Sequence, residues 1–174
     1  MPSRPVPAVR VPASFDSEFP EGDRRATETF LNIGLLVGGV RSAVESLVAE
    51  AGLPSMAAFN ALSVLGGDAQ PLQPSVIADR MMVTRATISG VLDSLEARRL
   101  VRRGAAAHDG RSRVVTLTPA GRRVVARLVP RLHEFERDLM CVLAPRQLDG
   151  LLDAVALLQH RLHELAPDAR LGIR

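Results

Sequence analysis

The sequence predicts a mainly α-helical protein with a small β-hairpin wing attached to a helix-turn-helix. Apolar residues recur every three to four positions over most of the chain, which is typical of helices packed through one face. Between about residues 71 and 118 this rhythm gives way to two short helices and two β-branched runs. We therefore expect a winged helix-turn-helix domain flanked by N- and C-terminal dimerisation helices.

Length and composition limit the class of protein. The chain has 174 residues, enough for one domain with its own core, and 47% of them are hydrophobic against 24% charged. No apolar run approaches the roughly 20 residues of a membrane span, and no secretory signal is evident. A single cysteine allows no internal disulfide. We therefore expect a cytoplasmic protein that does not interact with a membrane.

Positive charge is concentrated in one part of the chain. The net charge is only +3, and all 22 basic side chains are arginine. From Arg80 to Arg131 there are twelve arginines and three acids, a net of +9, whereas the rest of the chain carries a net of −6. Such a block predicts a polyanionic partner. The alternative is a solvated face with chance clustering of arginine.

The first part of the chain is predicted as an arm and two helices. Five prolines among the first 20 residues, with no sustained period, predict a flexible Pro-rich arm over residues 1–23 with little order. Residues 24–51 have apolar positions on one helical face. Gly52 is a stop signal, and a second helix is expected over about residues 54–65.

Two shorter helices follow. Pro74 is well placed as the first residue of a helix that reaches about Met81, because proline favours the first helical position. Thr84 is a suitable N-cap for a helix that reaches about Arg98. Two short helices joined by a tight turn make a helix-turn-helix.

A hairpin and two long helices complete the chain. The runs 100–103 and 114–117 are predicted strands, so residues 54–118 form the expected winged helix-turn-helix. Residues 119–165 are expected to form two helices whose apolar residues step by three and four, the seam of a coiled coil or bundle. With residues 24–52 they are the predicted dimerisation helices of a domain spanning 24–174.

A second copy of the chain is the expected cover for the spare apolar faces of these helices, because a small winged domain has little core to offer them. The alternative is a closed monomeric bundle.

The ordered motif resembles the MarR family of winged helix-turn-helix transcriptional regulators. The resemblance rests on four segments of the sequence: PLQPSVIADRMMVTRATIS at 71–89, VLDSLE at 91–96, LVRR at 100–103, and the wing DGRSRVVTLTPAG at 109–121. The wing matches the family pattern D-x-R-S followed by L-T-x-x-G. The flanking helices agree in type and order, so the resemblance covers nearly all of the chain after the arm.

The resemblance implies a homodimer in which each wing domain contacts half of a pseudo-palindromic site on double-stranded DNA. Carried over by position, the DNA-binding residues are Thr84, Arg85, Thr87, Ser89, Arg111 and Arg113. Arg85 is long enough to reach a guanine edge or a phosphate. The wing arginines could enter a minor groove, although pairing with Asp109 is an equally good role for Arg111.

The resemblance also implies a small-molecule effector, often aromatic, that binds between the dimer helices and the wing domains and changes the distance between the recognition helices. The sequence leaves open whether the protein is a repressor or an activator, and a repressor that the effector releases is the simpler expectation. The sequence does not identify the effector or its site, for which Phe59, Arg41 and His133 are only loose candidates.

Three positions depart from the family pattern. Met82 and Arg99 stand where turn glycines are usual, so each costs roughly 1 kcal/mol if the backbone φ there is positive. Gly90 stands where a basic residue is frequent, so one phosphate contact is expected to be missing.

Other functions have weaker support. Cys141, or His160 with His163, would suit an oxidant- or metal-responsive regulator of the same fold. The apolar neighbours of Cys141 favour an inert core thiol, and two histidines are too few for a metal site. A further alternative is a winged-helix protein-interaction module without specific DNA binding.

Neither an enzyme nor a resident cofactor or metal is expected. His108, Asp109 and Ser112 include the residue types of a hydrolase triad, but they lie within one loop that has no nucleophile-elbow or oxyanion signature.

Overall fold

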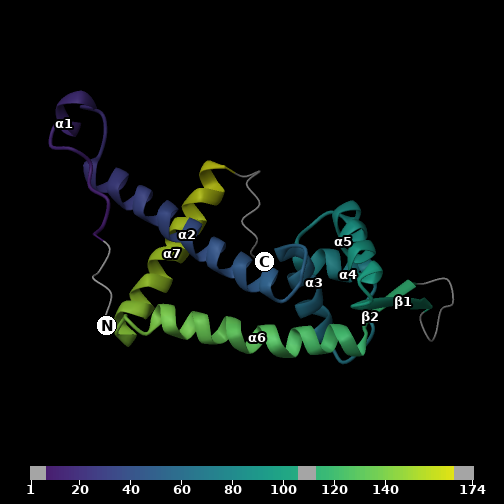
Figure 1. Cartoon of the computed structure of the whole chain (residues 1–174). Coiled ribbons are helices and arrows are strands. Elements are labelled where there is room, and N and C mark those ends of the chain that lie inside the picture. The colour runs from purple at the N-terminus through teal and green to yellow at the C-terminus, as the bar shows by residue number, and fades with distance from the viewer. Residues whose placement is uncertain (1–6, 106–112, 167–174) are drawn as a thin grey trace. The chain divides into compact units, whose positions relative to one another are not determined.

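The computed structural model describes residues 7–105 and 113–166, and the contacts between residues divide the chain into two units, Met1–Ser46 and Leu47–Arg174. The first unit contains α1 (Phe15–Glu18) and most of α2 (Arg24–Glu50), which Figure 1 shows in purple and blue. The sequence analysis expected little order before residue 24. Within residues 7–23 the structure instead places a short helix and several hydrogen bonds to α2.

The second unit is built around α3 (Met56–Gly66), α4 (Pro74–Met81) and α5 (Arg85–Ala97), which pack on one another (Figure 1). Side-chain caps fix where these helices begin: Ser55 Oγ accepts from the Ala58 N–H, and Pro74 is the first residue of α4. The fully buried side chains of the core come from all three helices, the hairpin and α6: Leu62, Ile77, Ile88, Leu92, Leu95, Leu128, Val101 and Val115.

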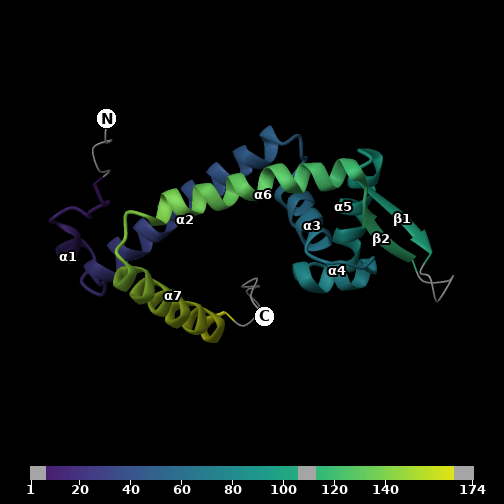
Figure 2. The ribbon, with the colours of Figure 1, turned by 90° about the horizontal axis from the view of Figure 1, so that it is seen from below.

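The hairpin consists of β1 (Val101–Ala105) and β2 (Arg113–Leu117), which pair antiparallel with Val101 opposite Leu117 and Ala105 opposite Arg113 (Figure 2). An isolated bridge between Leu72 and Val115 ties β2 to the segment before α4. The hairpin is therefore anchored at its base, where Val101 and Val115 are buried. Residues 106–112 lie outside the described chain.

Two long helices follow the hairpin: α6 (Pro119–Met140) and α7 (Pro145–Leu165). The first turns of α6 pack on α3 and β2, and its buried residues are Gly121, Val124 and Leu128. No residue of α7 is buried, and four of its large apolar residues are at least half exposed: Leu152, Leu157, Leu158 and Leu165. Val142, between the two helices, is also exposed.

The predicted fold class is confirmed: the chain is mainly helical with a two-stranded wing after a helix-turn-helix. The short helices begin at Pro74 and after the Thr84 cap, as the capping residues indicated.

The helix α2 is more apolar over its length than the sequence analysis suggested. An 18-residue window of α2 has a mean hydropathy of 1.3 and is only 6% buried, so this helix is long and apolar enough to cross a membrane.

Candidate nucleic-acid interface

The start of α5 is presented to solvent by a cap and a buried inner face. Thr84 Oγ1 accepts from the Thr87 N–H at 3.1 Å, and the two threonine hydroxyls lie 2.8 Å apart. Thr84, Arg85, Thr87 and Ser89 are all exposed, whereas Ile88 between them is 1% exposed. The inner side of the helix therefore fixes its position, and its outer side is free to contact another molecule.

Arg103 of β1 joins the wing to α5. Its guanidinium donates to the Asp93 carboxylate at 2.6 Å, to the Glu96 carboxylate at 3.2 Å and to the Ser89 carbonyl at 3.4 Å. Its backbone N–H also donates to Glu96 at 3.1 Å. One arginine thus neutralises the two acids of α5, which would otherwise repel a polyanion beside the exposed helix start.

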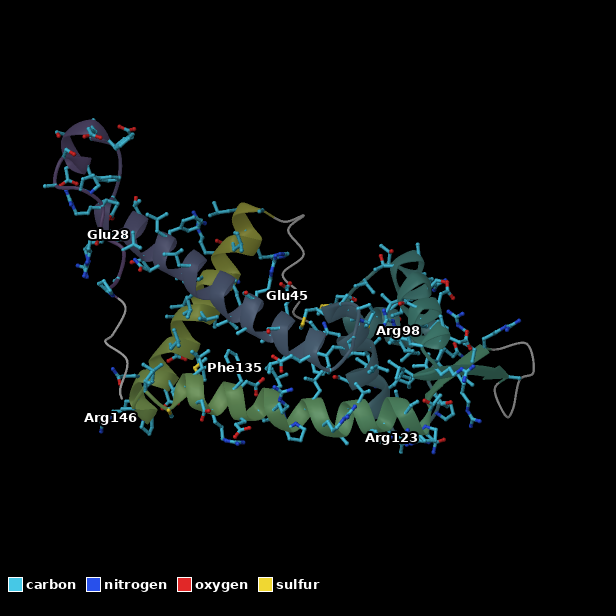
Figure 3. The ribbon with its side chains drawn as sticks, viewed as in Figure 1. Glu28, Glu45, Arg98, Arg123, Phe135 and Arg146 are labelled. Atoms are coloured by element: carbon cyan, nitrogen blue, oxygen red, sulfur yellow. The ribbon has the colours of Figure 1, made fainter. Side chains whose placement is uncertain are left out.

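Several arginines are exposed on and around this helix and the wing: Arg85, Arg98, Arg99, Arg102, Arg113, Arg122 and Arg123. Figure 3 labels Arg98, at the end of α5, and Arg123, in the first turns of α6. Arg98 donates to the Gly52 carbonyl at 3.2 Å, and Arg102 donates to the Thr116 hydroxyl at 3.1 Å. Most of the arginines of the block that the structure describes are therefore exposed on the second unit, where they are accessible to a polyanion.

The segment Thr118-Pro-Ala-Gly121 fastens the wing to α6. The Thr118 hydroxyl donates to the carbonyls of Arg99 and Leu100 and accepts from the Gly121 N–H. A Cβ on Gly121 would lie 2.1 Å from the Leu100 carbonyl oxygen, so only glycine fits there. This close approach explains why threonine and glycine occur three residues apart at this point of the sequence.

Two turns carry side chains on left-handed backbone. Met82, between α4 and α5, has φ 52°, and Arg99, after α5, has φ 58°. These two departures from the family's turn glycines are therefore strained positions, and each lowers the stability of the fold by about 1 kcal/mol. A Cβ on Gly90 would meet no atom within 4 Å, so packing does not require glycine there.

A cleft of about 770 Å³ lies between α3, the end of α4 and α6. Its apolar walls include Phe59, Val125 and Leu132, and Arg80, Ser63 and His133 add polar groups. Ser63 Oγ is buried and makes no hydrogen bond in the structure.

The model of the MarR family matches residues 51–112, which include α3, α4, α5 and β1. These residues are therefore similar to the MarR family over the helix-turn-helix and the first strand of the wing. The resemblance inferred from the motif is thereby confirmed for this part of the chain.

Solved structures share the MarR fold over most of the chain. A MarR-family transcriptional regulator from Silicibacter pomeroyi is 29% identical, with 76% of this chain and 86% of that chain covered and a TM-score of 0.55. The S. aureus MepR–DNA complex is 20% identical, covers 77% and 97%, and has a TM-score of 0.66. CouR from Rhodococcus jostii RHA1 bound to p-coumaroyl-CoA is 22% identical, covers 71% and 85%, and has a TM-score of 0.61. No curated protein matches the chain significantly.

The structure brings most of the MarR-type candidate residues into one region of the second unit. Thr84, Arg85, Thr87 and Ser89 lie on the exposed start of α5, and Arg113 is exposed at the outer end of β2. The sixth candidate, Arg111, lies outside the described residues, as does Asp109.

Arg103 was not among the predicted site residues. The local signal was present, since Asp93 and Glu96 are one turn apart on the predicted helix and Arg103 follows in the next element. The sequence does not show that β1 runs back along α5, which is what brings Arg103 next to these two acids.

The residues considered for oxidant or metal sensing, Cys141 and His160 with His163, lie in different surroundings. Cys141 is exposed, with its thiol 3.2 Å from the Asp138 carbonyl, so the prediction of a core thiol is wrong. The reason is that the last buried residue of α6 is Leu128, so the chain around Cys141 packs on no other described element. His160 lies 3.5 Å from Glu164, and within residues 7–105 and 113–166 no three metal-binding side chains cluster.

Proposed function

We propose that the chain is a homodimeric repressor that binds a pseudo-palindromic operator and is released by a small-molecule effector. The observation that carries the DNA-binding part is the exposed start of α5, where Arg85 projects beside Thr87 while Ile88 fixes the helix from within. Arginine there suits either a guanine edge or a phosphate. Thr87 and Ser89 are suited to phosphate or base contacts, and Arg113 to the adjacent minor groove.

The homodimer is supported by the amount of apolar surface that each chain leaves open. Phe30, Leu35 and Val37 of α2 are 78, 61 and 60% exposed, and the apolar residues of α7 are similarly open. Large apolar side chains left open on a helix in this number are expected to be covered in solution. A second copy is the economical occupant, because two-fold pairing would also present two α5 helices to two half-sites about one helical turn apart. Such a protein acts in the cytoplasm, where its operator is.

The cleft between α3, α4 and α6 supports the effector part of the proposal. Two of the three loose candidates, Phe59 and His133, line it, whereas Arg41 belongs to the other unit. A ligand with an apolar ring and one polar or anionic group would match this cleft. The ring would contact the apolar walls, and the polar group would lie near Arg80, His133 and the Ser63 hydroxyl. A small aromatic molecule with such a group is the expected ligand class, and CouR, bound to p-coumaroyl-CoA, shares this fold.

Selection of bound sequences from random duplex DNA tests the DNA-binding part. The purified protein is expected to select an inverted repeat, and its affinity is expected to fall steeply as salt rises. Arg85→Ala should weaken discrimination between sites by roughly 1–3 kcal/mol if the side chain contacts a base. An unchanged site preference in that variant would remove Arg85 from the proposed site. Weak, sequence-independent binding by the natural protein would favour the protein-interaction module instead.

The exposure of Cys141 keeps an oxidant-responsive regulator as a second candidate. Peroxide treatment of the natural protein and of Cys141→Ser distinguishes an oxidant-responsive regulator from one released by a small-molecule effector. Loss of operator binding in the natural protein alone would favour the sensor, and equal binding by both proteins would reject it.

A further inference from the structure

Three polar side chains of α2 hold the segment before it. Arg24, Glu28 and Asn32 are spaced four residues apart, so they lie on one face of the helix. Each of them hydrogen-bonds a different part of residues 9–16. The segment therefore runs antiparallel to α2 in a fixed register.

Arg24 fixes the end of the segment nearest the helix start. Its guanidinium donates to the carbonyls of Pro12 and Ala13 at 3.2 and 3.1 Å and to the Asp16 carboxylate at 2.9 Å. The same guanidinium lies 5.9 Å from the centre of the Phe15 ring. A planar side chain with five donors is well suited to gather several acceptors at a turn.

Glu28 is the central contact and is 7% exposed, which makes it the buried charged residue of the described chain. One carboxylate oxygen accepts from the Arg10 guanidinium at 2.6 Å, and the other accepts from the Val11 N–H at 3.1 Å. Figure 3 labels Glu28 near the start of α2. The hydrogen bond from Arg10 is the main cause that lowers the pKa of Glu28 below its usual value. Charge on this carboxylate is therefore favoured by the closed arrangement.

Asn32 fixes the far end of the segment through both polar groups of its amide. Its Oδ1 accepts from the Val9 N–H at 2.9 Å, and its Nδ2 donates to the Val9 carbonyl at 3.0 Å. This pairing is the one a neighbouring β-strand would supply, so Val9 is held as if it lay at a sheet edge.

We propose that residues 9–16 form a strap that closes on α2 through Arg24, Glu28 and Asn32 and stabilises the N-terminal half of that helix. The helix needs such support, because Gly34, Gly38 and Gly39 lie in its middle and a Cβ at any of them would meet no atom within 4 Å. These glycines are not required by packing inside the described chain and leave the helix weak on its own. The strap supplies hydrogen bonds and an ion pair over two turns just before them.

Limited trypsin digestion followed by mass spectrometry tests the strap. Trypsin cleaves after arginine, and the nitrogen of the Arg10–Val11 bond is the one that donates to Glu28. Cleavage of that bond in the folded protein follows the fraction of molecules in which the strap is open. Glu28→Gln keeps the shape but removes the charge, so this bond should be cut about tenfold faster than in the natural protein. Glu21→Gln, the same change at an exposed glutamate before α2, should leave the rate unchanged.

Hydrogen exchange of the full-length protein gives a second readout that does not depend on the cleavage site. In both Glu28→Gln and Asn32→Ala, amides in the N-terminal half of α2 should exchange faster, while amides of α5 should not change. Equal cleavage of the natural protein and Glu28→Gln would overturn the proposal. So would unchanged exchange in α2 for Asn32→Ala, a variant that keeps the Arg10–Glu28 pair.

Discussion

The helix α5 and the helix α7 have similar amphipathic sequences but treat their apolar residues in opposite ways. Ile88, Leu92 and Leu95 of α5 are at most 1% exposed, because α3, α4 and the hairpin surround them. In α7, by contrast, Leu152 and Leu157 are 69 and 72% exposed. Periodicity therefore shows that a helix has a face to bury, and it does not show whether the chain itself supplies the cover. This difference fits the proposed function, in which α5 belongs to a domain that folds by itself and α7 needs a second copy of the chain to cover its apolar face.

The largest expected effect is at the close approach between the wing and α6. Gly121→Ala should destabilise the protein by about 3 kcal/mol or more, because the new Cβ would overlap the Leu100 carbonyl. Gly150→Ala in α7 is the matched control: nothing lies within 4 Å of its Cβ position, so it should stabilise by about 1 kcal/mol. Urea unfolding of both variants measures the difference, and two shifts of the same sign would contradict this comparison.

The next largest effect is expected on dimerisation, at the exposed apolar face of α7. Leu158, which is 53% exposed, lies on the predicted seam, so Leu158→Glu should raise the dissociation constant of the proposed dimer about 100-fold by placing a charge in its interface. Sedimentation across a concentration series measures this shift. His160→Glu, on the solvent side of the same helix, should leave the dimer intact. Equal dissociation constants for Leu158→Glu and the natural protein would show that α7 is not the pairing element.

A smaller effect is expected where the wing joins α5. Arg103→Ala leaves Asp93 and Glu96 unpaired next to the exposed helix start, so stability should fall by about 1–2 kcal/mol and operator affinity by about tenfold. Arg102→Ala, on the neighbouring strand position, removes a hydrogen bond to Thr116 only and should lower stability less. Thermal unfolding and fluorescence anisotropy with operator DNA measure the two effects. If Arg102→Ala loses as much stability, the role assigned to Arg103 is incorrect.

The smallest effect is a gain in stability. Arg99→Gly should stabilise the protein by about 1 kcal/mol, because glycine adopts the φ of 58° without strain. Arg98→Gly, one residue earlier at φ −84°, relieves no strain and should not stabilise. The denaturant midpoints of the two variants test this difference in stability. A loss of stability in Arg99→Gly would mean that the arginine side chain makes a compensating contact.

Much of the second unit was predictable because local chemistry governs it. Pro74 and Thr84 fix the starts of α4 and α5, and the β-branched run 114–117 becomes the return strand. The exposed position of Arg85, Thr87 and Ser89 follows from helical period once the cap at Thr84 is known. The assignment of these residues to DNA remains a prediction until their variants are tested.

The sequence by itself determined the order of the elements, the caps and the alternation of buried and exposed positions, because these depend on residues a few places apart. Only the tertiary structure decided that Arg103 joins two acids of α5, that Gly121 lies against Leu100, that Glu28 holds Arg10 and that Cys141 is exposed. Such contacts join distant parts of the chain, and their geometry depends on how whole elements pack, which neither propensity nor periodicity encodes.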